Sequence, residues 1–295
     1  MLRLVEFLSD GTTLRGRLHL PQSEGPVPAV VMAHGFSATI DGMVVDRYAE
    51  VFAGSGMAVL LYDHRSFGIS SGTPRQQVDP WRQARGYRDA IAYLTTVPAI
   101  DPERIAIWGD SMSGGEAIAV AAVDARVRAL VAQVPACGDA LPPDDEAPIL
   151  DAMRAGITGD LPPVLPGTGP LPVVSSDQLG TPSHLTPLTA FRWFIEYGGR
   201  HGTNWENRAT RVSRSAPWHP VVCASELSIP SLFVIAPEDE MPGCRPEISV
   251  LAYRRAQGAE LLEVPGGHFG LLHHPGSAFE LASRVERDFL ALHLI

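Results

Sequence analysis

The amino-acid sequence predicts an α/β protein with a mostly parallel central sheet and helices on both of its faces. Short apolar runs of strand length alternate with stretches of helix length along most of the 295 residues. These runs are rich in Val, Ile and Leu without polar interruption, which is typical of parallel strands buried on both sides. One long break in the alternation, over residues 137–222, indicates an insertion.

The chain begins with an expected β-hairpin. The segments "LRLVEFLS" and "TLRGRLHLP" have alternating polarity, and Asp10-Gly11 between them is a strong turn signal. The next apolar run, "PAVVMAHG" at 28–35, is an expected buried strand. The following "DRYAEVFAGSG" is an expected helix that ends at glycine.

Strands and helices then alternate regularly. A strand over 57–64 precedes a helix for which Asp79 is the expected N-cap and Pro80 the first residue. The remaining expected elements are strands at 104–109, 127–135, 231–237 and 259–266, a helix at 116–124 and an amphipathic helix at 277–294.

Residues 137–222 lack this rhythm. Their first part is rich in Pro, Gly and Asp, and their second part carries aromatic residues in "TAFRWFIEYGG". A structureless loop of this length is rare in a compact domain, so we expect a helical cap above the carboxyl ends of the strands. Partial disorder over 140–180 is the alternative. The expected core comprises residues 1–136 and 223–295, and the expected cap or lid residues 137–222.

The composition excludes several classes of function. A net charge of −10 argues against non-specific binding to nucleic acid and against attraction to anionic membranes. The three cysteines, Cys137, Cys223 and Cys244, are scattered, so we expect neither a disulfide framework nor a zinc site. We expect no signal peptide, and the sequence shows no membrane-length apolar run, no phosphate loop and no dinucleotide fingerprint. We therefore expect a cytoplasmic protein without metal or cofactor.

Two serines compete for the role of nucleophile. Ser70 lies in "GISSG", which matches the frame Gly-x-Ser-x-Gly, whereas Ser111 lies in "GDSMS", where Ser113 replaces the second glycine. A nucleophile elbow requires a strand, a tight turn and a helix, with small residues two positions before and after the serine. Ser111 has this context, with Gly109 before it, whereas a turn-forming stretch follows Ser70. We expect Ser111 to be the nucleophile; a plain helix cap is the alternative.

A serine hydroxyl needs a base, and the base needs an orienting acid. The strand "SLFVIA" ends in Glu238, Asp239 and Glu240, which places an acid at the carboxyl end of a strand. His268 follows the next strand in a glycine-flanked loop and is the expected base. The other late histidines, at 273, 274 and 293, are expected to be surface or structural residues. One of the three carboxylates is the expected acid, and loop solvation by all three is the alternative.

An oxyanion hole requires two backbone N–H groups near the nucleophile. Met112 follows the expected nucleophile and supplies one of them. The other is expected in "AHGFS", from Phe36, where Gly35 permits a close approach of the backbone. His34 in the same segment is expected to be structural.

The expected cap contributes several aromatic residues near the site. They are Phe191, Trp193, Phe194, Tyr197, Trp205 and Trp218. Most are expected to pack the cap itself, because their spacing is helical. We select Phe194 and Trp205 as candidate substrate contacts, and an apolar lid favours a hydrophobic acyl group.

With these residues in place, the chain resembles the α/β-hydrolase family over nearly its full length. The segments that carry the resemblance are "AHGF", "LYDHRSFGISSG", "IWGDSMSGG", "APEDEMP" and "PGGHFG". They are similar to the branch of dienelactone-hydrolase-like and X-prolyl-peptidase-like esterases and peptidases. The resemblance implies a triad of Ser111, Asp239 and His268, and it identifies the Ser70 segment as a family loop. Ser113 departs from the usual elbow.

The expected function is that of a serine hydrolase that cleaves an ester, thioester or related acyl bond of a hydrophobic small molecule. The reaction would pass through an acyl-enzyme. A C–C bond hydrolase or a peptidase on the same fold, and a non-catalytic ligand-binding protein, are the alternatives. The expected partner is a small-molecule acyl substrate, without nucleic acid or membrane, and a homodimer is left open.

Overall fold

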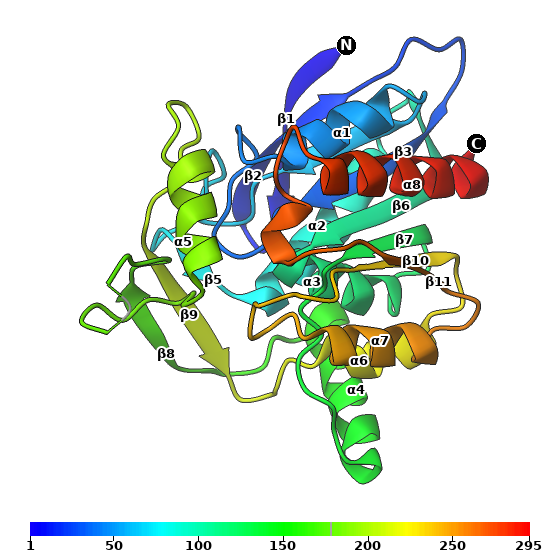
Figure 1. Cartoon of the computed structure of the whole chain (residues 1–295). Coiled ribbons are helices and arrows are strands. Elements are labelled where there is room, and N and C mark those ends of the chain that lie inside the picture. The colour runs from blue at the N-terminus through cyan, green and yellow to red at the C-terminus, as the bar shows by residue number, and fades with distance from the viewer. Residues whose placement is uncertain (178) are drawn as a thin grey trace.

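A computed structural model of the chain describes residues 1–177 and 179–295 (Figure 1). Its centre is an eight-stranded sheet in the order β1-β2-β4-β3-β6-β7-β10-β11. The strands are β1 (Leu2–Ser9), β2 (Thr12–His19), β3 (Val27–Ala33), β4 (Ala58–Tyr62), β6 (Ile100–Asp110), β7 (Val127–Gln133), β10 (Ser231–Ile235) and β11 (Glu260–Glu263). Only the β1–β2 and β2–β4 pairings are antiparallel among these described strands. The predicted mostly parallel sheet is confirmed.

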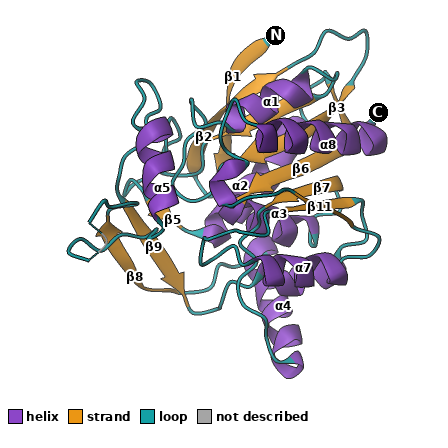
Figure 2. Ribbon diagram, viewed as in Figure 1, coloured by secondary structure: helices purple, strands orange, loops and turns teal. Residues whose placement is uncertain are grey.

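Helices cover both faces of this sheet. Figure 2 shows α1 and α8 side by side over one face, and these two helices are in contact. The other face carries α2, α3, α6 and α7. The bounds are α1 (Val45–Ala53), α2 (Pro80–Leu94), α3 (Ser111–Ala121), α6 (Pro220–Cys223), α7 (Pro246–Arg255) and α8 (Ser277–Leu294).

Strand β3 shows why its sequence is apolar throughout. Val30 and Met32 pack in the cluster beneath α1 and α8, whereas Val31 and Ala33 pack in the cluster on the opposite face. Successive side chains of a strand point to opposite faces, so a strand covered on both faces needs apolar residues at every position. Complete burial of a Val or Met side chain contributes about 1.5–3 kcal/mol. These strands therefore form a rigid platform for the loops at their ends.

The inserted region is not helical throughout, and the prediction of a helical cap is wrong in this respect. It contains α4 (Pro143–Thr158), β8 (Val164–Leu171), α5 (Leu188–Trp193), a π-helical turn η1 (Phe194–Gly198) and β9 (Ala209–Arg214), followed by α6. Strand β9 pairs with β8 and also with β5 (Gln77–Val78) from outside the insertion. Helix α4 and strand β8 occupy much of 140–180, where disorder was the alternative. The proposed domain boundaries stay a prediction.

Asp79 precedes α2 as predicted, but its carboxylate has a different partner. No side-chain cap bond forms at this helix. Instead the Arg214 guanidinium on β9 donates to both carboxylate oxygens, at 3.0 Å to Oδ1 and 2.5 Å to Oδ2. The side chains of both residues are buried. This ion pair therefore ties the inserted region to the start of α2.

No helix in the described part of the chain is long and apolar enough to cross a membrane.

Candidate active site

Ser111 occupies the turn between β6 and α3 in a strained backbone conformation. Its φ is +56°, in the left-handed region that non-glycine residues seldom adopt. A side chain at Gly109 would lie 2.2 Å from the Ser113 carbonyl oxygen, so the chain can double back here only with glycine two residues before Ser111. This strand, tight turn and helix have the geometry of a nucleophile elbow. The serine is partly exposed and lines a cavity.

The loop after β3 approaches the elbow closely. A Cβ at Gly35 would lie 2.9 Å from the Ser111 Cβ, and the Gly35 N–H donates to Asp110 Oδ1 at 3.1 Å. Phe36 follows directly in this loop. Met112 is the second residue of α3, where backbone N–H groups have no partner within the helix. Both expected oxyanion donors thus belong to segments that adjoin Ser111.

Asp239 and His268 form a buried pair beside the elbow. The His268 Nδ1 atom lies 2.7 Å from Asp239 Oδ2, and both side chains are almost inaccessible to solvent. The Met241 N–H donates to Asp239 Oδ1 at 2.9 Å and fixes the carboxylate. Of the two neighbouring acids, Glu238 is exposed, and Glu240 accepts a hydrogen bond from the His268 backbone N–H at 3.1 Å. Asp239 thus contacts the imidazole, whereas Glu240 holds the backbone of the loop that carries His268.

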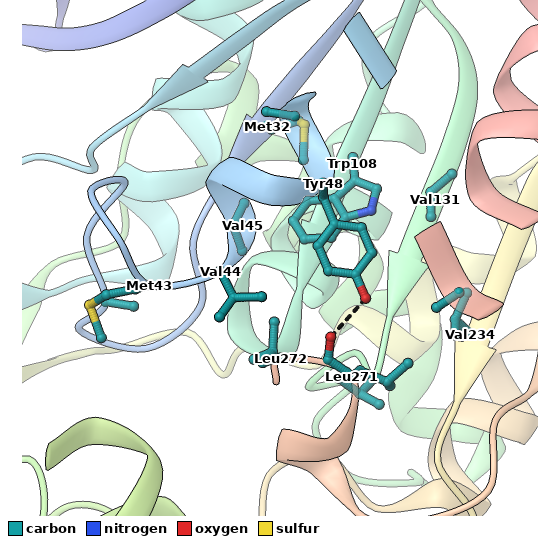
Figure 3. Packing of buried hydrophobic residues seen from close by; sticks show 14 of the residues in the cluster. Met32, Met43, Val44, Val45, Tyr48, Trp108, Val131, Val234, Leu271 and Leu272 are labelled. Atoms are coloured by element: carbon teal, nitrogen blue, oxygen red, sulfur yellow. Dashed lines mark hydrogen bonds between the residues drawn. The ribbon is translucent and has the colours of Figure 1, made fainter. Parts of the chain in front are cut away.

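The loop that carries His268 is anchored from two sides. The Tyr48 hydroxyl on α1 donates to the Leu271 carbonyl oxygen at 2.8 Å, as Figure 3 shows within the surrounding apolar cluster. From the inserted region, the Trp193 indole N–H donates to the Leu272 carbonyl oxygen at 2.6 Å. The position of the imidazole therefore depends on both the core and the insertion.

Cys244 is a site residue that sequence reasoning missed. Its Sγ lies 3.5 Å from the Ser111 hydroxyl oxygen, within hydrogen-bonding distance for sulfur. Burial lowers the pKa of His268, but Cys244 and Asp239 together outweigh burial and hold that pKa well above its usual value. The sequence feature that could have identified Cys244 is its position, because it follows Asp239 by five residues in the same loop.

The departure at Ser113 is explained by a buried polar cluster behind the elbow. The Ser113 hydroxyl bonds to the His34 carbonyl oxygen and lies 2.9 Å from His64 Nε2 and 3.2 Å from Glu116 Oε2. A glycine here would leave these groups without that hydroxyl. Burial lowers the pKa of His34 to about 3, and its ring has no hydrogen-bond partner within the described residues. Asp110, whose pKa burial raises to about 7, adjoins the same cluster.

Ser70, the other candidate, is buried in a loop and its hydroxyl is already bonded. It accepts from the Arg15 backbone N–H at 2.8 Å and donates to the Asp63 carbonyl oxygen at 2.5 Å. The Asp63 carboxylate in turn accepts from the N–H groups of Ile40 and Ile69, each at 2.9 Å. These bonds make the Ser70 segment a structural loop at the end of β4.

Two cavities adjoin the elbow. The first is narrow, about 30 Å³, and lies between Ser111 and His268 on one side and Trp193 and Phe194 on the other. The second, about 320 Å³, is lined by Phe36 and Met112. Phe36 borders both cavities.

The two candidate substrate contacts occupy different positions. Phe194 lines the narrow cavity directly. Trp205 packs against Phe194 in a tilted arrangement, with ring centroids 5.3 Å apart, and it lines neither of the two cavities. A direct contact of Trp205 with substrate stays a prediction. In this structure Trp205 adjoins the narrow cavity indirectly, through its contact with Phe194. Within the described residues, no group of three His, Cys, Asp or Glu side chains could hold a metal ion.

Comparisons with known proteins agree with this architecture. Residues 10–141 match the family described as X-Pro dipeptidyl-peptidase (S15 family). The chain is 33% identical over 295 residues to a thiohydrolase of Eupenicillium brefeldianum, across 97% of this chain and 92% of that protein. It is 50% identical over 132 residues to the thiohydrolase aneE of Aspergillus aculeatus, a match that spans 44% of this chain and only 41% of that protein.

A solved structure extends the likeness to three dimensions. The α/β hydrolase GrgF from Penicillium sp. sh18 is 27% identical to this chain, with a TM-score of 0.75. The match covers 100% of this chain and 99% of that one. The α/β-hydrolase fold predicted from the sequence is thereby confirmed.

Proposed function

Because the chain belongs to the α/β-hydrolase family, we propose that it is a serine hydrolase that cleaves a thioester or carboxylic ester of a hydrophobic acyl group. The observation that carries the proposal is the strained Ser111 at the β6–α3 turn beside the buried His268–Asp239 pair. The thiohydrolases among its relatives favour the thioester as the scissile bond.

In the proposed first half-reaction, the Ser111 hydroxyl oxygen attacks the acyl carbonyl carbon. His268 accepts the hydroxyl proton at Nε2, while Nδ1–H donates to the Asp239 carboxylate. The carbonyl oxygen becomes negatively charged, and the N–H groups of Phe36 and Met112 would stabilise it. His268 then gives its proton to the leaving thiolate or alkoxide, and an acyl-serine remains.

In the second half-reaction, water attacks the acyl-serine. His268 takes a proton from the water and returns it to the Ser111 oxygen as the carboxylic acid leaves. The Asp239 carboxylate is nearly inaccessible to solvent, so its charge acts with little screening on the imidazolium that forms transiently in both steps. This charge stabilises the imidazolium and holds the ring in one orientation.

The test is turnover of matched substrates. Octanoyl thioesters and octanoyl oxyesters with leaving groups of the same length should both be hydrolysed, and the thioester should have the higher kcat/KM. Ser111→Ala should abolish turnover of both. Binding of these compounds without turnover by the wild-type protein would instead support a non-catalytic ligand-binding role. Activity confined to peptide or C–C bonds would also overturn the proposal.

A further inference from the structure

The larger cavity beside the elbow contains a guanidinium without an acidic partner. Arg211 on β9 lines this cavity together with Phe36 and Met112. It is the only charged side chain among the described residues of the lining. Most of the other lining side chains are apolar, including Val78, Pro80 and Trp218.

Arg211 lacks an acidic partner, unlike Arg214 on the same strand. Arg214, three residues further on, is paired with Asp79 at 2.5 Å. The Arg211 guanidinium instead lies over the Phe36 ring, 4.6 Å from its centroid, and no carboxylate pairs with it in the described part of the chain. The Arg211 residue is exposed, so this unpaired guanidinium is accessible to an anion, which would bind it through charge-assisted hydrogen bonds.

The position of Arg211 relates this cation to the reaction. Phe36 separates the two cavities and carries one expected oxyanion donor, while Met112 carries the other. An anion at Arg211 would thus belong to a different part of the substrate from the scissile carbonyl. The cavity volume of about 320 Å³ is within the usual range for small-molecule sites, and its apolar walls suit a hydrocarbon chain.

We propose that this cavity is a subsite for a hydrophobic substrate that carries a single anionic group, a carboxylate or a phosphate ester, bound by Arg211. This inference rests on the proposed hydrolase function. The anion has two chemical sources: a carboxylate at the far end of the acyl chain, or a phosphate on the leaving thiol. The overall charge of −10 disfavours anionic ligands in general, so selectivity for one requires a local cation.

Two matched pairs of thioesters distinguish the sources. The first pair is an acyl chain that ends in a carboxylate and the same chain as its methyl ester, both on a neutral thiol. The second pair is a neutral acyl group on pantetheine and on 4′-phosphopantetheine. We expect the wild-type protein to favour the anionic member of one pair by about tenfold or more in kcat/KM, since a hydrogen bond to a charged group has this magnitude. The pair that shows the preference identifies the source.

Arg211→Gln should remove this preference. It should lower kcat/KM for the anionic member by about ten- to a hundredfold and leave the neutral member nearly unchanged. Arg211→Lys should retain part of the preference, because the charge remains without the planar fork. Arg208→Gln is the matched control, because Arg208 lines a different hollow, and it should behave as wild type. Equal losses on charged and neutral substrates, or no preference in either pair, would overturn the subsite.

A binding measurement separates this inference from the proposed function. Calorimetric titration of Ser111→Ala with a medium-chain dicarboxylic acid monoester and its neutral diester, and with 4′-phosphopantetheine and pantetheine, requires no turnover. Tighter binding of the anionic member of either pair that Arg211→Gln abolishes supports the subsite even if no thioester is hydrolysed. Charge-independent binding in both pairs, or none, contradicts the subsite even if hydrolysis is observed.

Discussion

The Cys244 sulfur lies 3.5 Å from the Ser111 hydroxyl oxygen, and Cys244 interacts electrostatically with the His268 imidazole. The thiol is buried, so its influence on the imidazole is weakly screened by solvent. Together with Asp239 it raises the pKa of His268 against the opposing effect of burial. In the proposed reaction His268 is the general base and must be unprotonated to act, so its pKa would set the pH above which the protein is active.

Cys244→Ala should therefore move the acidic limb of the kcat/KM profile to lower pH. The substitution removes a group that raises the pKa of His268, while burial still lowers it. The neutral imidazole would then persist at a lower pH. The measurement is kcat/KM for one thioester across the pH range, with Cys244→Ser as the control that retains a hydrogen-bonding group. An unmoved limb in Cys244→Ala would show that the thiol does not influence the base.

Asp239→Asn should lower kcat by about 10⁴, because the imidazole loses its orienting charge and its correct tautomer. Glu238→Gln should change kcat by less than about threefold, since that side chain is exposed and the Asp239–His268 pair remains. Single-turnover kinetics on both variants check this. A dominant loss in Glu238→Gln would assign the acid to the neighbouring position.

The stability of the protein should fall as the pH rises through the neutral range. Burial raises the pKa of Glu286 to about 8, above the value near 4.5 expected in the unfolded chain. Between these values the folded state keeps a proton that the unfolded state loses, so the stabilisation is complete below pH 4.5 and is lost by about pH 8. The slope for one group is at most about 1.4 kcal/mol per pH unit.

Glu286→Gln tests this contribution, because glutamine is neutral and its carbonyl oxygen can still accept from the Trp108 indole N–H, now 2.9 Å from Glu286 Oε2. Urea unfolding at pH 5, 6, 7 and 8 should show that the free energy of unfolding depends less steeply on pH in the variant than in the wild type. The buried Asp110 should contribute to the pH dependence of the free energy of unfolding in both proteins, because burial raises its pKa to about 7. Identical slopes would mean that Glu286 is ionised in the folded state.

Phe194→Ala should shift acyl-chain preference toward longer substrates. The ring closes a cavity of only about 30 Å³ beside Ser111, and its removal makes room for further methylene groups. Each buried methylene contributes about 0.8 kcal/mol, or roughly fourfold in kcat/KM. A series of thioesters from acetyl to decanoyl measures the shift. Trp205→Ala should give a weaker shift in the same direction, because Trp205 supports Phe194 from behind.

Uniform loss of activity on every chain length, together with a lower melting temperature, would count against this role. The two aromatic residues would then only pack the inserted region, and substrate length would be set elsewhere in the site.

Local pattern was sufficient to predict the central sheet. Strands such as β3 are apolar at every position, and each is followed by a turn or helix signal, so their order could be found without long-range information. The elbow at Ser111 was predictable for the same reason, since strand, glycine and helix are adjacent in the chain. The α/β-hydrolase family predicted from these segments is also confirmed.

The features that sequence analysis missed depend on contacts between distant segments. Strand β9 gains its second neighbour from Gln77–Val78, and the Asp79 carboxylate finds Arg214 at a separation of 135 residues. Cys244 lies beside Ser111, which precedes it by 133 residues. No periodicity in the sequence indicates such pairs, because they arise only when the loops meet above the sheet.

The most direct test of the account is to find which residue carries the covalent adduct after reaction with a fluorophosphonate. Peptide mass mapping of the wild-type protein should place one phosphonate on Ser111, and Ser111→Ala should remain unlabelled while still folded. Ser70→Ala should label at the wild-type rate, because Ser70 is buried and hydrogen-bonded within its own loop. An adduct on Ser70 or any other residue, or hydrolysis of thioesters that persists in Ser111→Ala, would contradict the assignment of Ser111 as the nucleophile.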